Sequence, residues 1–293
     1  MQERTRFESE LRTLGLQERE VIPPRDDRTP VPDTTLVPFR WICRITANTQ
    51  KGHSFGSGVV IGPRHILTCA HVIYPLQDLY RTEEILVSPG QNNSDQPLGQ
   101  YRANGWIVHP QWMRGRQPHC GFDYGIIRLR ENIATKTFAK LRNQPLGHWG
   151  SVNSIARLQA IDPRVLTGQT IRLAGYPGDL DTEARRMYYS RGPIIGSALF
   201  NACGGHPQDK IFPDVNAQSR LLLYEADTFG SQSGCPVWTY DNRTQERLLV
   251  GIHQGANHLV DRTGTRRPVN LAVRVTDEVI NQVATWIRTF VER

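Results

Sequence analysis

The sequence lacks any apolar run that approaches the ~18 residues of a membrane-spanning helix. Its first twenty residues, Met1 to Glu20, are charged throughout and contain no apolar core of a secretory signal. These absences argue against a helical membrane anchor. They favour a cytoplasmic protein without a membrane partner over a secreted one.

Cysteine is also scarce, because the chain has only five, an odd number without regular spacing. A disulfide framework needs paired cysteines. CxxC pairs usually indicate a structural zinc site, and this sequence has none. We therefore expect buried or free thiols in a reducing compartment, and no metal.

The net charge of +7 comes from basic residues scattered along the chain. A nucleic-acid surface needs a basic stripe interleaved with aromatic side chains, which is missing here. We predict a general electrostatic bias and no specific nucleic-acid partner. The sequence does not predict an oligomeric state.

Glycine and proline, by contrast, are plentiful, with 25 and 19 among 293 residues. Turn residues between short apolar runs favour short strands over long helices. Six such runs over about ninety residues predict a small antiparallel barrel, and a second set follows. The first set is 39–45, 55–61, 65–73, 85–87, 106–108 and 124–129; the second is 170–174, 187–189, 194–199, 221–225, 236–239, 248–253 and 269–273.

We therefore predict an all-β protein with barrels over residues 21–130 and 169–275, joined by a polar connection over 131–168. A C-terminal helix is predicted over 276–293, with Thr276 as its N-cap. Two acidic residues in the first turn suit the helix dipole, and apolar residues recur along one side.

The stretch 230–236, Gly-Ser-Gln-Ser-Gly-Cys-Pro, places Ser233 in a tight loop of small residues. Glycines permit backbone angles that a Cβ would forbid, so neighbouring main-chain N–H groups can converge beside the Ser233 hydroxyl. An oxyanion forms at such a point during acyl transfer. Taken alone, however, clusters of this kind are more often ordinary turns.

His71 and Asp123 supply the partners that a serine nucleophile needs. His71 ends an apolar segment that would form barrel wall, and Asp123 precedes an apolar strand. Each alone would more often be structural. Together, the aspartate can accept the imidazole N–H, fix its tautomer and stabilise the imidazolium that forms as Ser233 attacks. This chemistry requires no metal and no organic cofactor.

The chain order His71, Asp123, Ser233 is that of chymotrypsin-like proteases. Further motifs are 21–29 with 33–35, 56–58, 175–177 and 251–255. On these motifs the chain resembles trypsin/chymotrypsin-fold serine proteases, and more closely the bacterial glutamyl endopeptidases of staphylococcal type. The similarity runs from about residue 21 to the terminal helix.

This resemblance implies a chymotrypsin-like fold of two six-stranded antiparallel barrels with a C-terminal α-helix. It implies a serine endopeptidase that forms an acyl-enzyme on protein or peptide substrates. The triad is His71, Asp123 and Ser233, and the main-chain N–H groups of Ser231 and Ser233 form the oxyanion hole.

The resemblance also implies a specificity pocket. Thr228 and His253 match residues that line it in glutamyl endopeptidases, and the α-amino group of the mature chain, here Val21, sits beside them. Because Glu20 precedes Val21, an enzyme that cuts after glutamate would release residues 1–20 as a pro-segment. The alternative is a loose or packing tail that stays attached.

Two positions depart from the family pattern. Ser231 stands where glycine is usual in the oxyanion hole, and a positive φ there would cost about 1–2 kcal/mol. Gln232 replaces the aspartate that pairs with a new N-terminus in trypsin-like zymogens, so that activation switch is not expected.

Asp227 leaves the specificity open. It matches the pocket-floor position that binds Arg or Lys in trypsin-like enzymes, and there it would repel glutamate. Turned toward His253, it would instead hold that imidazole protonated. Glu or Asp before the cut is the first hypothesis and Arg or Lys the second. A third is a conditionally active or non-catalytic module on the protease fold.

Overall fold

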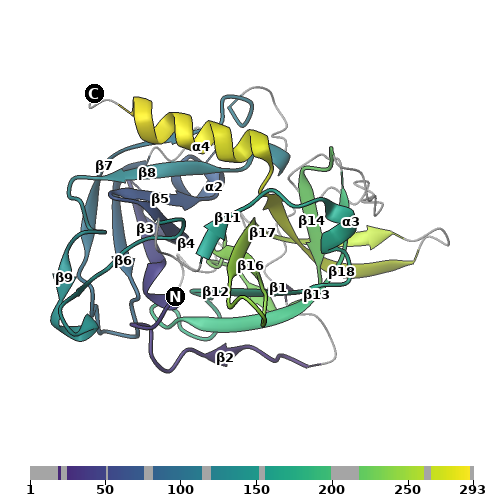
Figure 1. Cartoon of the computed structure of the whole chain (residues 1–293), viewed down its shortest axis with the longest axis horizontal. Coiled ribbons are helices and arrows are strands. Elements are labelled where there is room, and N and C mark those ends of the chain that lie inside the picture. Colours follow the sequence, from purple (N-terminus) through teal and green to yellow (C-terminus); the bar gives the residue numbers. More distant parts are fainter. Residues whose placement is uncertain are drawn as a thin grey trace.

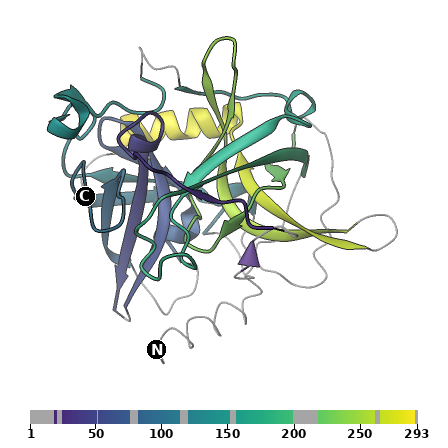
Figure 2. The ribbon, with the colours of Figure 1, turned by 90° about the horizontal axis from the view of Figure 1, so that it is seen from below.

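The chain folds into two β-barrels that stand side by side, and the stretch that contains β2 (Thr29–Pro30) crosses from the second barrel toward the first (Figures 1 and 2). This arrangement confirms the predicted fold class. The structure is a computed structural model that describes residues 19–20, 25–50, 52–75, 82–113, 120–151, 156–198, 218–260 and 265–290.

The first barrel is closed by antiparallel strands in the order β3-β4-β5-β8-β7-β6. Along β3, the alternate residues Cys43, Ile45 and Ala47 are buried, so Thr46 and Asn48 lie on the outer face. The strands are β3 (Ile42–Thr49), β4 (Gly52–Gly62), β5 (His65–Thr68), β6 (Thr82–Pro89), β7 (Tyr101–Val108) and β8 (Gly125–Leu129).

The second barrel closes in the order β12-β13-β14-β18-β17-β16, since β16 also pairs with β12. Outside this ring, β11 pairs parallel to β17 and β2 pairs with β13. The strands are β11 (Ala156–Leu158), β12 (Thr170–Gly175), β13 (Tyr188–Ala198), β14 (Leu221–Tyr224), β16 (Pro236–Tyr240), β17 (Arg247–Val260) and β18 (Arg266–Arg274).

Four predicted strands differ in detail. The first begins with a 3-10 turn, η1 (Phe39–Trp41), in which buried Trp41 donates its indole N–H to the Leu146 carbonyl. Residues 65–73 divide into β5 and a short helix, α2 (Ala70–Ile73). The two runs between 187 and 199 form one strand, β13, whose register shifts at a bulge between Ile194 and Gly196.

The connection over 131–168 packs against the barrels. Trp149 lies between Trp41 of η1 and Trp238 of β16, with ring centroids 6.0 and 5.7 Å away. All three rings are almost fully buried, so they join the two barrels through one apolar cluster. The other elements of the connection over 131–168 are β9 (Thr137–Phe138), η3 (Ala139–Leu141), β10 (Gln144–Pro145) and α3 (Pro163–Leu166).

The predicted C-terminal helix is confirmed as α4 (Asp277–Thr289), which lies across the first barrel (Figure 1). The Thr276 hydroxyl caps it by accepting a hydrogen bond from the Val279 N–H. The buried Trp286 ring packs on Tyr124, with centroids 5.6 Å apart.

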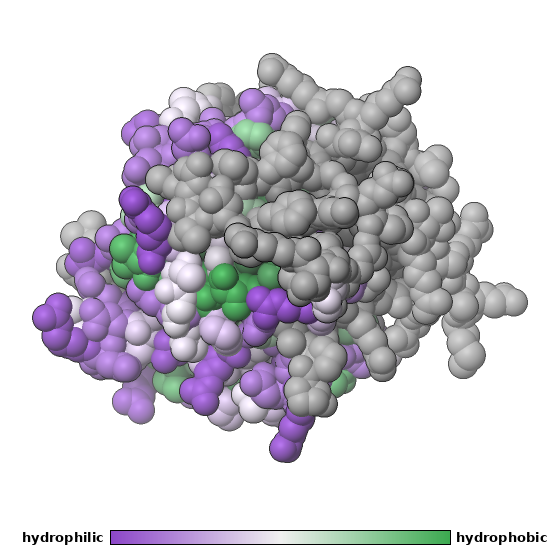
Figure 3. Space-filling model, turned by 90° about the vertical axis from the view of Figure 1, so that its right-hand side faces the viewer, coloured by the Kyte–Doolittle hydropathy of each residue, from purple (hydrophilic) through white to green (hydrophobic). Residues whose placement is uncertain are grey.

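The helices within the described part of the chain are all too short or too polar to cross a membrane. On the face shown in Figure 3, the described side chains are mainly hydrophilic, and hydrophobic ones form small separate patches.

Candidate active site

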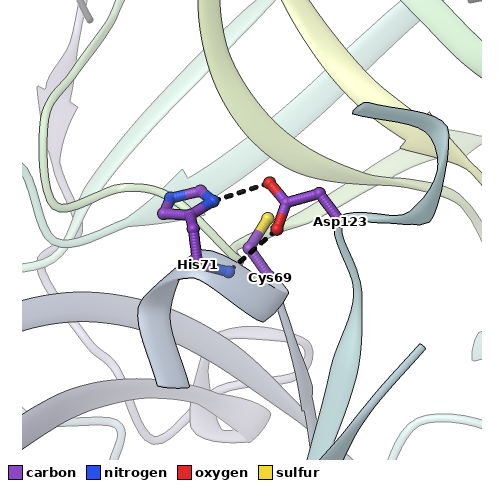
Figure 4. A group of neighbouring side chains, drawn as sticks. All are labelled: Cys69, His71 and Asp123. Carbon is purple, nitrogen blue, oxygen red and sulfur yellow. Dashed lines mark hydrogen bonds and ion pairs between the residues drawn. The ribbon is translucent and has the colours of Figure 1, made fainter. Parts of the chain in front are cut away.

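His71 and Asp123 form the pair that the sequence predicts (Figure 4). His71 lies in α2 directly after β5, and Asp123 follows the 3-10 turn η2 (Cys120–Phe122). The His71 Nδ1 atom is 2.6 Å from Asp123 Oδ2, and the His71 main-chain N–H donates to Asp123 Oδ1 at 2.9 Å. Asp123 is 1% exposed, so one buried carboxylate holds the ring and the backbone of the histidine.

Cys69 lies beside this pair, and its thiol is 3.1 Å from the His253 carbonyl oxygen (Figure 4). The ligand atoms of Cys69, His71 and Asp123 lie within 4.8 Å of one another, a spacing that a metal ion could bridge. Burial, with Asp123 nearby, raises the pKa of the Cys69 thiol well above its usual range. The thiol is therefore protonated, and a metal would have to displace both its proton and the His71–Asp123 hydrogen bond.

The Ser233 loop has the predicted backbone geometry. Ser231 and Gly234 both have positive φ, 76° and 88°. A Cβ on Gly234 would overlap the Thr68 hydroxyl and the Ser57 carbonyl oxygen, so the loop packs directly on the first barrel. The Ser57 N–H donates to the Ser233 carbonyl at 2.8 Å.

The main-chain N–H groups of Ser231 and Ser233 have no hydrogen-bond acceptor among the residues that the structure describes. The Gly230 carbonyl accepts from the Gly178 N–H at 2.9 Å. Because the peptide unit is planar and trans, the Ser231 N–H points to the opposite side. The Ser231 carbonyl is held by the Ser57 hydroxyl at 3.0 Å. Within the described part of the chain, neither N–H group is therefore already bonded, as the predicted oxyanion hole requires.

Gln254 contacts two residues of the predicted triad, Asp123 and Ser233. Its side-chain amide donates to Asp123 Oδ2 at 2.9 Å and to the Cys120 carbonyl at 3.1 Å. Its main-chain carbonyl accepts from the Ser233 hydroxyl at 3.1 Å. The Ser233 hydroxyl is therefore hydrogen-bonded to the Gln254 carbonyl in this structure and not to His71.

Thr228 and His253, the predicted pocket residues, are both fully buried. The Thr228 hydroxyl donates to Asn270 Oδ1 at 2.9 Å. His253 Nδ1 lies 2.5 Å from the Tyr224 hydroxyl, which leaves the other ring nitrogen as the second hydrogen-bonding atom of the imidazole.

The chain around residue 20 reaches this pocket. The strand β1 (Arg19–Glu20) pairs antiparallel with β15 (Thr228–Phe229), and Glu20 is opposite Thr228. Asp227 accepts a hydrogen bond from the Asp27 N–H at 2.6 Å, so its carboxylate is bound by the N-terminal stretch. Val21 and the helix predicted within residues 1–20 lie outside the described residues.

Comparison with known proteins gives the family. A model described as "Trypsin-like peptidase domain" matches residues 56–252. The chain belongs to the trypsin-like peptidase family.

Relatives of this trypsin-like peptidase include two glutamyl endopeptidases. The Bacillus licheniformis protein is 27% identical over 271 residues, which cover 89% of this chain and 67% of that protein. The Staphylococcus epidermidis protein is 27% identical over 237 residues, covering 80% and 66%. The chain thus spans about two thirds of the length of these curated relatives.

The fold agrees with solved structures. A structure described as Glu endopeptidase in complex with MPD matches with a TM-score of 0.63 and 22% identity, covering 90% of this chain and 98% of that one. A scabies mite inactivated protease paralogue matches with a TM-score of 0.59 and 14% identity. Identities this low support the chymotrypsin-like fold alone.

Gln232 holds the Ser233 loop of this peptidase through two hydrogen bonds to Phe229. Its buried side-chain oxygen accepts from the Phe229 N–H at 2.9 Å, and its own N–H donates to the Phe229 carbonyl at 3.1 Å. The loop around Ser231 is therefore fixed by an amide where the family pattern has an aspartate.

Sequence reasoning missed Gln254 and Ser57, although both lie inside motifs that it singled out, 251–255 and 56–58. Ser57 lies between two glycines and Gln254 follows a histidine, and neither pattern indicates a particular role for the residue. The expectation that the thiols are free is also wrong at one position. Cys120 is disulfide-bonded, whereas Cys43, Cys69 and Cys235 are free and buried.

Proposed function

We propose that this trypsin-like peptidase is a serine endopeptidase that uses Ser233, His71 and Asp123 as its triad. The proposal rests on one observation: Gln254 binds both the Asp123 carboxylate and the Ser233 hydroxyl, beside two main-chain N–H groups without acceptors among the described residues. We take the His71–Asp123 pair and these two N–H groups to act on one nucleophile, Ser233.

The first chemical step begins with rotation of the Ser233 hydroxyl from the Gln254 carbonyl toward the outer nitrogen of His71. His71 then accepts the proton as the serine oxygen attacks the scissile carbonyl, and Asp123 stabilises the imidazolium. The N–H groups of Ser231 and Ser233 bind the oxyanion, and each such donor contributes about 2.7–4 kcal/mol. His71 returns the proton to the leaving amine, which produces an acyl-enzyme that water hydrolyses.

We propose a preference for glutamate, or aspartate, before the cut. The Tyr224 hydroxyl and His253 Nδ1 are hydrogen-bonded, which holds the imidazole at the predicted pocket, and an imidazole N–H is a group that can bind a substrate carboxylate. One Asp227 oxygen binds the Asp27 N–H, which makes it less available to an arginine or lysine of the substrate. The glutamyl endopeptidase relatives support the same preference.

Two assays test these proposals. A fluorophosphonate probe should label the wild type and not Ser233→Ala, and an unlabelled wild type would indicate a non-catalytic module. Fluorogenic peptides with Glu, Asp, Arg, Lys or Phe before the cut should be hydrolysed fastest with Glu. Faster cleavage after Arg or Lys would instead assign Asp227 to the pocket floor.

We also propose that residues 1–20 are a pro-segment released by cleavage after Glu20. The pairing of β1 with β15 supports this, because it aligns Glu20 with Thr228 at the pocket. N-terminal sequencing of the purified wild type should give Val21, and Ser233→Ala should keep residues 1–20. Identical starts in both would exclude autoprocessing.

A further inference from the structure

A short stretch, residues 176–179, lies against the loop of the predicted nucleophile, and we call it the strap. The Gly178 N–H of the strap donates to the Gly230 carbonyl at 2.9 Å. The contact is close, because a Cβ on Gly178 would lie 3.6 Å from that carbonyl oxygen and 3.1 Å from the Ser231 hydroxyl. The Gly230–Ser231 peptide is planar and trans, so this hydrogen bond fixes the direction of the Ser231 N–H, a predicted oxyanion donor.

The strap also holds the next peptide of the loop, through Ser57. The Tyr176 N–H donates to the Ser57 hydroxyl at 3.1 Å, and that hydroxyl donates to the Ser231 carbonyl at 3.0 Å. The peptide groups on both sides of Ser231 are therefore tied to the strap. Ser231 has a φ of 76°, a conformation that residues with a side chain keep only where the surroundings impose it. The strap supplies that constraint.

The two ends of the strap are anchored differently. Tyr176 is fully buried, and its hydroxyl donates to the Gln91 carbonyl at 3.1 Å. Asp179, at the other end, lies in a turn with its side chain 24% exposed. Its two carboxylate oxygens accept from the two terminal nitrogens of Arg28, at 2.9 and 2.6 Å. The second anchor of the strap is therefore an ion pair to a residue 151 positions away in the sequence.

The Arg28 guanidinium is itself held in place. Its side chain is 1% exposed, and Asp26 accepts from its Nε at 3.0 Å and from a terminal nitrogen at 2.6 Å. The planar guanidinium matches carboxylate oxygens two at a time, so each of these pairs has a defined geometry. A buried charge is costly to leave unpaired. Arg28 is therefore a rigid link between its own N-terminal stretch and the strap.

The same N-terminal stretch also holds the segment that precedes the Ser233 loop. The Asp27 N–H donates to the Asp227 carboxylate at 2.6 Å. Residues 26–28 thus bind the strap with one side chain and the predicted pocket segment with one main-chain group. Gln232 stands where the family pattern has an aspartate, so no carboxylate is present there to pair with a new α-amino group.

We propose that Arg28 is a positioning residue for the oxyanion hole: its ion pair with Asp179 holds the strap, and the strap directs the Ser231 N–H. An internal arginine then has the role that a new chain end has in trypsin-like zymogens. Because the ion pair involves no chain end, the hole forms while residues 1–20 are still attached. This inference rests on the proposed endopeptidase function.

Asp179→Asn tests the ion pair, and Asp26→Asn is the matched control. Each substitution removes one carboxylate charge from the same guanidinium, but only Asp179 belongs to the strap. With a fluorogenic peptide that carries Glu before the cut, Asp179→Asn should lower kcat at least roughly tenfold and leave KM nearly unchanged, because an oxyanion donor acts in the transition state. Asp26→Asn should keep kcat close to the wild-type value. Equal losses of kcat in the two variants, or a rise in KM alone, would overturn the proposal.

Hydrogen exchange tests the strap without requiring catalysis. In Ser233→Ala, which should keep residues 1–20, the segments 176–182 and 228–236 should be protected. Adding Asp179→Asn should make both exchange faster, since the Gly178 N–H loses its fixed acceptor, whereas adding Asp26→Asn should not. Equal exchange in the two double variants would overturn the strap, whether or not the enzyme is active. Faster exchange without a loss of kcat would show that the strap does not direct the oxyanion donor.

Failure of the proposed function has a different signature. A wild type that neither cleaves peptides nor reacts with the fluorophosphonate probe would overturn the endopeptidase. The exchange of residues 176–182 would then still decide whether Arg28 holds the strap.

Discussion

The two barrels hold their shares of the site in different ways. In the first barrel, Asp123 fixes both the ring and the backbone of His71, and the acid–base pair is complete within that barrel. In the second, the Ser233 loop has its own hydrogen bonds through Gln232 but is also held from outside, through Ser57 and the packing of Gly234 against Thr68. The predicted acid–base pair is therefore built in one barrel, and the predicted nucleophile, Ser233, is positioned by contacts between the two barrels.

The largest expected effect comes from breaking the pair in the first barrel. Asp123→Asn should reduce kcat by about 10⁴-fold, because an amide does not hold the imidazole in the tautomer that accepts the serine proton. Hydrolysis of a fluorogenic peptide measures the loss. Asp241→Asn, an exposed turn residue, is the control and should retain full activity. A loss below tenfold would mean that Asp123 does not orient His71 during the reaction.

The first barrel also contains a buried histidine, His65, that should make the free energy of unfolding fall in acid. Burial, with Arg128 and Arg64 nearby, lowers the pKa of His65 to about 4 from the unfolded value of 6.5. The folded state resists protonation of His65, whereas the unfolded chain accepts the proton below pH 6.5. The free energy of unfolding is therefore unaffected above pH 6.5 and falls as the pH falls toward 4. The loss should reach about 3 kcal/mol.

Urea unfolding at pH 7 and pH 4 checks this prediction with His65→Phe, which cannot be protonated. The variant should lose about 3 kcal/mol less free energy of unfolding than the wild type over this interval. His53→Phe is an exposed control and should behave like the wild type. Equal losses in all three proteins would show that His65 is not protonated on unfolding.

Removing the hydrogen bond between Gln254 of the second barrel and Asp123 of the first should have an intermediate effect on kcat. Gln254→Met keeps the side-chain length but removes the hydrogen bond to the buried Asp123 carboxylate. A hydrogen bond to a charged group contributes about 1.5–3 kcal/mol, so kcat should fall about 10- to 100-fold. KM for a short peptide should change little, because Gln254 acts through Asp123. A rise in KM with unchanged kcat would assign Gln254 to substrate binding instead.

The smallest effect concerns the backbone of the second barrel. Ser231 has φ of 76°, where a side chain costs about 1–2 kcal/mol and glycine costs less. Ser231→Gly should raise the free energy of unfolding by about 1 kcal/mol, after the greater freedom of glycine in the unfolded chain is included. The melting temperature should rise by a few degrees. Ser231→Ala keeps the Cβ and should show no gain.

Much of the site was predictable because its chemistry is local. His71, Asp123 and Ser233 each stand in a short motif, and their chain order indicates the fold. Gln254 was not predictable, since its role depends on a register that brings β17 beside Asp123. The pairing of Cys120 was likewise hidden, because spacing alone does not show which cysteines meet. Glu20 beside Thr228 also required the tertiary structure.

The sequence by itself determined the two barrels and the terminal helix, and it supplied the three candidate reactive side chains, because strand periodicity, turn residues and reactive groups are properties of short stretches. Only the tertiary structure decided which carbonyl accepts a hydrogen bond from the Ser233 hydroxyl and which main-chain N–H binds the Asp227 carboxylate. These features depend on contacts between residues that are distant along the chain. Which of these residues meet in space is set by how the barrels pack.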